Sequence, residues 1–288
     1  MEKTCHMLKQ LLCYCQYILP QHLLSSFIGK LANSRPDWIK NNLIDWFSRT
    51  YAITLNDALI NKPHDYPTFN AFFTRKLKPG ARPVDSAIDS IISPADGTIA
   101  EIGVINDQQL LQAKGMYFDL PTLFGNQHDT AALFNNGNFA TIYLAPHNYH
   151  RVHMPFTGTL KQSIYIPGKL FSVNRITAQL IPNLYARNER LILLFDTDAG
   201  PMAVVLVGAL IVGSMQTIWM DEPIRSPAIE VMYPNREIRL DKGDELGHFQ
   251  LGSTVIMLFP QNKLHWAQHA TASANILTGQ CMASLTQA

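Results

Sequence analysis

The sequence has little that would direct it to nucleic acid. Its 288 residues include 23 Lys and Arg against 22 Asp and Glu, so the formal net charge is only +1. It contains no basic arm, no zinc-finger spacing and no interleaving of aromatic with basic residues. Because nucleic-acid binding depends on concentrated positive charge, we expect no nucleic-acid partner.

The sequence also lacks an apolar run of the ~20 residues that a membrane-spanning helix requires. The longest run, residues 202–213, is rich in Val and Ile and therefore predicts buried strands. Residues 11–19 are mildly similar to a signal peptide, but they include Gln16 and no small-residue cleavage site follows. We therefore predict neither a membrane span nor a signal peptide.

Cysteine is scarce, with Cys5, Cys13, Cys15 and Cys281 only. Three of the four crowd the N-terminus, and their spacing is not that of a disulfide framework. This pattern indicates reduced thiols and fits a reducing compartment.

The chain is long enough, and at 47% hydrophobic content apolar enough, to build a substantial core. Helical patterns come first, and short β-like runs with turn glycines follow from Ile91. The expected strands are 97–105, 139–144, 157–166, 191–195, 203–212 and 255–259, with helical intervals at 118–124 and 174–184. This order predicts an α+β fold with a mostly antiparallel β body.

Two glycine turns, residues 242–247 and 278–282, resemble the turns of small carrier-type β-barrels. We divide the chain into an N-terminal helical, membrane-associating region, residues 1–65, and a β-rich catalytic domain, residues 66–288.

Apolar residues recur at helical spacing on both sides of Pro20. They are Leu8, Leu11, Leu12, Cys15, Ile18 and Leu19 before it, and Leu23, Leu24, Phe27, Ile28 and Leu31 after it. One interpretation packs these helices on the protein's own core. The other lays them in a membrane surface, which their lysines and their single acid, Glu2, favour. A third helix is expected to begin near Pro36, a good first-turn residue.

A basic cluster follows a group of phenylalanines. It consists of Arg75, Lys76, Lys78 and Arg82, with no acidic residue before Asp85. These side chains either form a solvated loop or contact phosphate, on a ligand or on a membrane surface.

Three short segments contain residues that can react. Residues 93–97, Ser-Pro-Ala-Asp-Gly, read as an ordinary turn when taken alone. In residues 149–155, His150 and His153 point to opposite faces if the segment is extended, and share a face that could bind metal if it is helical. Ser253 stands where a loop enters an apolar strand. A serine hydroxyl at such a position can cap, be solvated or react.

These motifs occur together and in a fixed order: Phe-Phe-Thr-Arg-Lys-Leu-Lys-Pro-Gly-Ala-Arg-Pro (72–83), Ser-Pro-Ala-Asp-Gly (93–97), Tyr-His-Arg-Val-His-Met-Pro (149–155) and Leu-Gly-Ser-Thr (251–254). With them the chain resembles the phosphatidylserine decarboxylase family in its shorter, bacterial form, from about Tyr66 to near the C-terminus. The resemblance implies self-cleavage between Gly252 and Ser253. The products would be a β chain, 1–252, and an α chain, 253–288, that form a heterodimer; a higher oligomer stays open.

The resemblance also implies roles for particular residues. Asp96, His153 and Ser253 match the family's self-cleavage triad, with His153 as the base and Asp96 orienting its ring. Ser253 attacks the Gly252 carbonyl; elimination and hydrolysis then turn it into a covalent pyruvoyl group, the cofactor. His150 matches the family histidine that transfers a proton during decarboxylation. Independently of the resemblance, the chemistry of the attack makes Thr254 a candidate oxyanion donor, with a purely structural role for its hydroxyl as the alternative.

The expected reaction converts phosphatidylserine to phosphatidylethanolamine and CO2 through a Schiff base with the pyruvoyl group, as a step of phospholipid biosynthesis. The expected location is peripheral, on the cytoplasmic side of the cell membrane, against its anionic surface. Two alternatives stay open: a metal-dependent hydrolase with His150 and His153 as ligands, and a non-enzymatic peripheral lipid-binding module.

Overall fold

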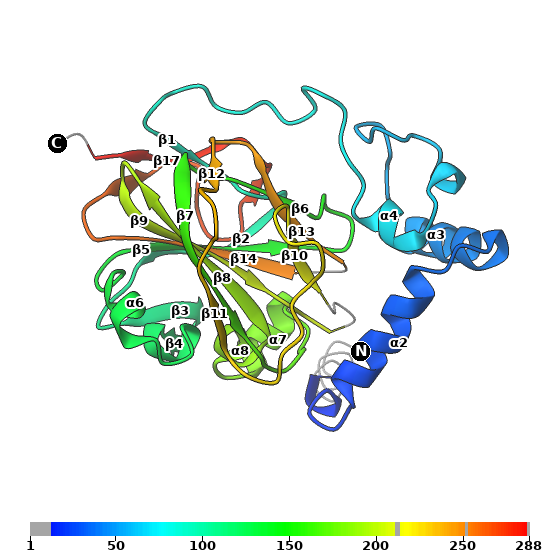
Figure 1. Ribbon diagram of the computed structural model, residues 1–288, viewed down its shortest axis with the longest axis horizontal. Helices are drawn as coiled ribbons and strands as arrows, with labels where there is room; N and C mark the ends of the chain where they lie inside the picture. Colours follow the sequence, from blue (N-terminus) through cyan, green and yellow to red (C-terminus); the bar gives the residue numbers. More distant parts are fainter. Residues whose placement is uncertain (1–12, 211–213, 251–252, 287–288) are drawn as a thin grey trace, which may run out of the picture.

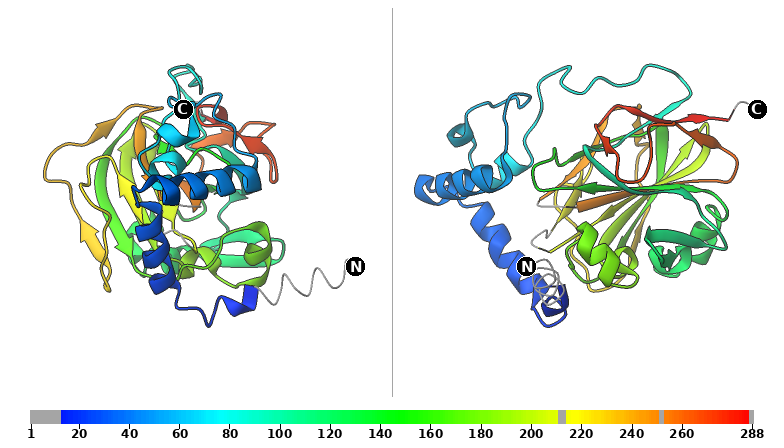
Figure 2. Two further views of the ribbon diagram at one scale, coloured as in Figure 1. Left: turned by 90° about the vertical axis from the view of Figure 1, so that its right-hand side faces the viewer. Right: turned by 180° about the vertical axis from the view of Figure 1, so that it is seen from behind.

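A computed structural model describes residues 13–210, 214–250 and 253–286. The N-terminal helices lie to one side of a β-rich body (Figures 1 and 2). They are α2 (Gln21–Ala32), α3 (Asp37–Tyr51), the 3-10 turn η1 (Pro63–Asp65) and α4 (Phe69–Phe73). Pro36 occupies the N-cap of α3, which confirms the third helix predicted from the sequence. Leu8, Leu11 and Leu12 lie outside the described residues.

The body is organised around a nine-stranded sheet in which every pair is antiparallel. Its path runs β11 (Glu230–Met232), β7 (Gly158–Ile166), β8 (Arg190–Thr197), β9 (Gly200–Val207), β14 (Ser253–Phe259), β5 (Asn138–Leu144), β2 (Gly97–Val104) and β16 (Asn275–Ile276), and β12 (Arg239–Leu240) pairs with β7. The α+β prediction is confirmed. Among the described strands this path is open, from β11 to β16, and does not close into a barrel.

Smaller sheets and short helices complete the body. They are β1 (Ser90–Ile92), β17 (Cys281–Leu285) and β15 (Leu264–Trp266); β10 (Met215–Thr217), β13 (Glu245–Phe249) and β6 (Arg151–His153); the hairpin β3 (Gln109–Ala113) and β4 (Met116–Asp119); and the helices α5 (Leu120–Leu123), α6 (His128–Ala132), α7 (Arg175–Leu180) and α8 (Leu184–Arg187). Both predicted glycine turns are present, with Gly243 and Gly279 at positive φ of 91° and 88°.

The main sheet is buried on both faces, which explains why its central strands are apolar without alternation. In β9, Val205 and Val207 belong to one core cluster, while Val204 and Leu206 belong to the cluster on the other face. All seven residues of β14 are buried. A residue at the start of β14 therefore sits on a rigid element in the middle of the sheet.

Candidate functional site

Ser253 is the first residue of β14 and is fully buried. In the sheet it pairs with Leu144 of β5. Its hydroxyl oxygen has no hydrogen-bond partner among the described residues. An unpaired buried hydroxyl costs about 1–3 kcal/mol of stability, so its presence here calls for a reason other than stability. Such a residue is a candidate for chemistry.

Thr254 is also buried, and its hydroxyl has no hydrogen-bond partner in the part of the chain that the structure describes. Because side chains alternate along a strand, it points to the face of β14 opposite Ser253. Its assignment as oxyanion donor stays a prediction.

Asp96 lies at the same end of the sheet as Ser253. Thr98 of β2 and Thr254 of β14 both pair with Tyr143 of β5, so β5 lies between the two segments. Strands in a sheet are ~4.8 Å apart, which puts the Asp96 backbone about 10 Å from that of Ser253. Gly97 permits this approach, because a Cβ there would lie 2.4 Å from the carbonyl oxygen of Tyr143.

The Asp96 carboxylate is almost fully buried and accepts hydrogen bonds from two residues. Arg82 donates from Nε to both oxygens at 3.0 Å and from Nη2 to Oδ2 at 2.6 Å. Thr278 donates from its backbone N–H and its hydroxyl to Oδ1, both at 2.9 Å. Asp57 forms an outer ion pair with the same guanidinium at 3.0 Å. The contact with Asp96 raises the pKa of Arg82.

His153 ends the short strand β6, next to the Asp96 turn. Its backbone N–H donates to the carbonyl of Pro94 at 2.7 Å. In the ring, Nδ1 lies 2.8 Å from the carbonyl oxygen of Gly243, and Nε2 lies 2.9 Å from the hydroxyl of Tyr149. The carbonyl can only accept, so Nδ1 carries the proton and Nε2 is the basic nitrogen, which accepts from Tyr149.

His150 is fully buried and stacks on Phe73, with ring centroids 4.0 Å apart. Nε2 lies 3.4 Å from the carbonyl of Pro146, and Nδ1 has no partner among the described residues. Burial, assisted by the positive charge of Arg75, lowers the pKa of His150 to about 3. The imidazole is therefore neutral at physiological pH and presents one unpaired nitrogen.

The two histidines do lie on opposite sides of their segment, as the extended alternative requires. His150 and Val152 are buried, whereas Arg151 and His153 are partly exposed. The carbonyl of His150 accepts from Phe249 N–H at 3.1 Å, and its ring borders Pro146, two residues beyond the partner of Ser253. The structure thus gathers Asp96, His150, His153 and Ser253 at one end of the sheet. Among the residues it describes, no hydrogen bond links Asp96 to His153 or His153 to Ser253.

Two residues of this site were missed from the sequence. Tyr149 directly precedes His150 in the histidine motif. Its position close to two histidines could have identified it as a site residue. Thr278 lies in a glycine turn that was recognised only as a turn, and nothing local connects it with Asp96.

The four basic residues near position 78 differ in their surroundings. Arg75 is buried and donates to the carbonyls of His147 and Asn148 at 3.1 and 3.3 Å. Arg82 is bound to Asp96, as described above. Lys78 donates to the carbonyl of Asn56 at 2.7 Å and is exposed, as is Lys76. Any contact of this cluster with phosphate therefore rests on the two lysines, and stays a prediction.

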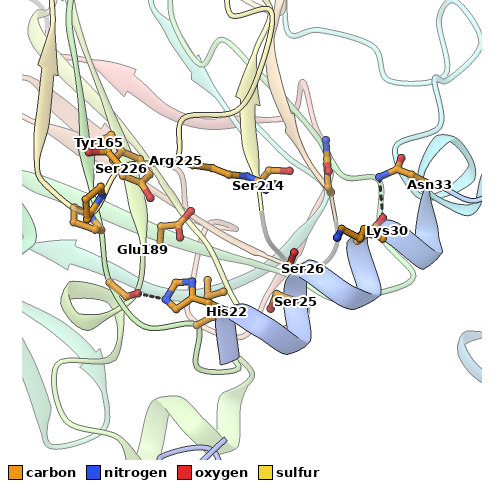
Figure 3. A pocket seen from close by; sticks show the side chains of 16 residues that line it. His22, Ser25, Ser26, Lys30, Asn33, Tyr165, Glu189, Ser214, Arg225 and Ser226 are labelled. Atoms are coloured by element: carbon orange, nitrogen blue, oxygen red, sulfur yellow. Dashed lines mark hydrogen bonds between the residues drawn. The ribbon is translucent and has the colours of Figure 1, made fainter. Parts of the chain in front are cut away.

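A cavity of about 760 Å³ lies between α2 and the sheet (Figure 3). α2 contributes His22, Ser25 and Lys30, and the body contributes Glu189 and Arg225 among others. Gln250, three residues before Ser253, also lines it. The cavity thus adjoins the strand end that holds the candidate site.

The described residues offer neither a metal site nor a membrane-spanning helix. The described part of the chain contains no group of three or more His, Cys, Asp or Glu side chains that could hold a metal ion. Within the same residues, no helix is both long and apolar enough to cross a bilayer.

Taken together, the fold and the site define an α+β enzyme built around a buried serine at the start of a central strand, with two histidines on the adjoining segment. A family model described as phosphatidylserine decarboxylase matches residues 69–282, and a second, described as PSD, matches residues 11–52.

Curated relatives are similar over nearly the whole chain. A phosphatidylserine decarboxylase proenzyme of Ectopseudomonas mendocina (strain ymp) is 48% identical over 281 residues, which cover 96% of this chain and 98% of the relative. The proenzyme of Azotobacter vinelandii is 48% identical over 274 residues, 93% of this chain and 95% of the relative. The chain belongs to the phosphatidylserine decarboxylase family, and it is a lyase of the decarboxylase class.

Proposed function

We propose that this enzyme converts phosphatidylserine to phosphatidylethanolamine and CO2 with a pyruvoyl group that it makes from its own Ser253. The observation that carries the proposal is the buried Ser253 hydroxyl at the start of a rigid central strand, which has no hydrogen-bond partner within the described part of the chain. The relatives are named as proenzymes, which supports a processing step.

The residues at the site fit the formation of such a group. His153 takes the proton of the Ser253 hydroxyl at Nε2, and the oxygen attacks the carbonyl carbon of Gly252. The Gly252–Ser253 C–N bond breaks, the freed Ser253 amine takes the proton back from His153, and an ester remains. Loss of the Ser253 α-proton then breaks the Cβ–O bond, which releases the Gly252 carboxylate and leaves dehydroalanine; its imine form takes up one water and loses one ammonia. Once formed, the pyruvoyl group supplies a ketone that accepts electrons from the carbon losing CO2.

Intact mass of the purified protein tests this proposal. Two chains, 1–252 and 253–288, with the smaller one blocked at its N-terminus, are expected, together with release of ammonia. A single uncut chain that decarboxylates phosphatidylserine would exclude a pyruvoyl mechanism. A single uncut chain that binds lipid without turnover would favour a binding module instead.

Substitutions of the two histidines should affect different steps: His153 is needed for self-cleavage, and His150 for decarboxylation. His153→Ala should leave the chain uncut, because Ser253 loses the base that takes its proton. His150→Ala should be cut but decarboxylate at least ~100-fold more slowly, the usual scale for loss of a proton-transfer group. The measurements are a denaturing gel for cleavage and CO2 release for turnover. Normal cleavage in both variants would contradict this assignment.

Membrane contact is proposed for the outer surface of α2. Leu23 and Phe27, one turn apart on α2, are 74% and 67% exposed, and Trp38 and Trp46 on α3 are similarly exposed. Other residues of α2, among them His22, Ser25 and Gly29, line the cavity. Apolar contact of the outer face with a bilayer would therefore place the cavity beside the lipid surface. The location on the cytoplasmic face stays part of this proposal.

Liposome flotation measures that contact. The double variant Leu23→Ser, Phe27→Ser should bind anionic vesicles at least ~10-fold more weakly, because burial of one large apolar side chain contributes about 1.5–3 kcal/mol. Ile88→Ser is the matched control, since Ile88 is 92% exposed on a loop of the body. If the control loses as much vesicle binding as the double variant, or if the double variant loses none, α2 is not the surface that contacts the membrane.

A further inference from the structure

Glu189 is a buried carboxyl group that the mechanism above does not use. It is 8% exposed and lines the cavity beneath α2. Among the described residues no cation lies within 4.0 Å of its carboxylate. A buried carboxyl group without a paired cation is rare in proteins and needs a reason.

The sheet fixes where Glu189 stands relative to Ser253. Arg190 of β8 and Thr254 of β14 both pair with Val207 of β9, so they lie two strands apart in one row. Glu189 and Ser253 each precede a member of this row. Since β8 and β14 both run antiparallel to β9, the two residues lie at the same end of the sheet. Continuing the alternation one residue beyond β8 puts their side chains on the same face, with backbones about 10 Å apart.

The backbone around Glu189 is held rigidly. Its N–H donates to Lys169 and its carbonyl accepts from Gly208, both at 2.8 Å. The buried side chain of Asn188 donates to the carbonyls of Phe171 and Gly208 at 2.8 Å. A carboxyl group on such a backbone can position a ligand reproducibly.

The charges around the cavity complement a phosphoserine headgroup. Figure 3 shows Glu189 between His22 and Arg225 on opposite walls, with Lys30 farther along α2. Lys30 and Arg225 are cations suited to a phosphate and a carboxylate, and Glu189 is the acidic side chain among the lining residues. The headgroup carries two anionic groups and one ammonium.

From this arrangement, and resting on the proposed function, we propose that Glu189 receives the ammonium group of the phosphatidylserine headgroup and takes one proton from it. One N–H bond breaks and one O–H bond forms on the Glu189 carboxylate. The amine is then neutral, with a free electron pair, as reaction with a ketone requires.

The ionisation of Glu189 agrees with this role. Burial raises its pKa to about 7, against the opposing effects of Tyr165 on β7 and Arg225. The other groups facing it across the cavity are His22 and Lys30 of α2. A base with a pKa near the working pH both loses and gains its proton readily.

Lipid binding by the uncut protein tests the proposal without using its activity. The Ser253→Ala variant, with and without Glu189→Gln, is titrated with dihexanoyl phosphatidylserine and with the matching ester of 3-hydroxypropanoic acid, which lacks only the amine. Glu189→Gln should weaken phosphatidylserine binding about tenfold or more and leave the amine-free lipid unaffected, since only the former loses a charge-assisted contact.

Two further measurements sharpen the result. Phosphatidylserine binding should strengthen as pH rises through about 7, where Glu189 ionises, and Glu189→Gln should remove this dependence. The amine-free lipid, measured over the same pH range, corrects for any pH dependence that does not involve the amine. The matched control is Glu101→Gln, because Glu101 is a half-buried carboxyl group outside the cavity lining. This variant should bind both lipids, at every pH, as the Ser253→Ala protein does.

Equal weakening of both lipids by Glu189→Gln, or no weakening of either, would overturn the proposal. Failure of the proposed function is seen separately, as a wild-type protein that neither cuts itself nor releases CO2.

Discussion

Ser253→Ala should leave the purified protein as one chain of 32.3 kDa that releases no CO2 from phosphatidylserine. Alanine keeps the backbone of β14 and removes only the oxygen that attacks the Gly252 carbonyl. Cleavage should therefore be lost entirely rather than slowed. Intact mass after prolonged incubation measures this, and any accumulation of chains 1–252 and 253–288 would contradict it.

The same substitution should not destabilise the fold. The Ser253 hydroxyl has no partner and is fully buried, so its removal eliminates a desolvated polar group and breaks no hydrogen bond among the described residues. We therefore expect removal of the hydroxyl to leave the free energy of unfolding of the uncut protein unchanged or to raise it by up to about 1 kcal/mol, as measured by urea denaturation. Thr141→Ala provides a matched control. Thr141 is likewise buried, its hydroxyl has no partner among residues 13–210, 214–250 and 253–286, and it lies mid-strand in β5. Thr141→Ala should be cut normally.

Much of the fold could be predicted because its signals are local. The apolar run of residues 255–259 predicted a buried strand, and the structure adds only Ser253 and Thr254 to its start. Pro36 marked the beginning of α3. The order of strands in the sheet could not be predicted, because β14 pairs with β5 and β9, which lie more than 40 residues away in the sequence.

The candidate site shows the same limit. Asp96, His150, His153 and Ser253 were picked out through motifs, and their gathering at one end of the sheet depends on pairing through Tyr143 that no local pattern encodes. Arg82 was expected to be a solvated or phosphate-binding residue. Its contact with Asp96 depends on a fold-back of the chain, which brings residues 14 positions apart together. Glu189 gave no sequence signal, because a carboxyl group becomes unusual only once it is buried.

The hydrogen bonds around Asp96 should also hold the processed enzyme together. Arg82 and Asp96 lie in residues 1–252, whereas Thr278 lies in residues 253–288, so the Asp96–Thr278 contacts would join two chains after cleavage. β14 makes the larger connection, since it inserts between β5 and β9. The carboxylate therefore has a structural role that precedes any role in processing.

Asp96→Asn should lower the free energy of unfolding by about 3–5 kcal/mol, because it leaves the largely buried Arg82 guanidinium without its main counter-charge. All variants are best compared in the Ser253→Ala background, where every protein is uncut, by urea denaturation. Asp57→Asn is the matched control: Asp57 pairs with the same guanidinium but its side chain is 59% exposed, so its loss should cost less than about 1 kcal/mol.

Combining Asp96→Asn with Arg82→Gln isolates the interaction itself. The double variant should be less destabilised than the sum of the two single variants, by a coupling energy of at least ~1.5 kcal/mol. Each single variant leaves one buried charge of the pair without its partner, whereas the double variant removes both charges. Additive effects, or an Asp57→Asn cost equal to that of Asp96→Asn, would show that the buried pair does not stabilise this end of the sheet. With Ser253 restored, Asp96→Asn should also stay uncut, because the turn that holds the backbone of His153 through Pro94 would lose its anchor.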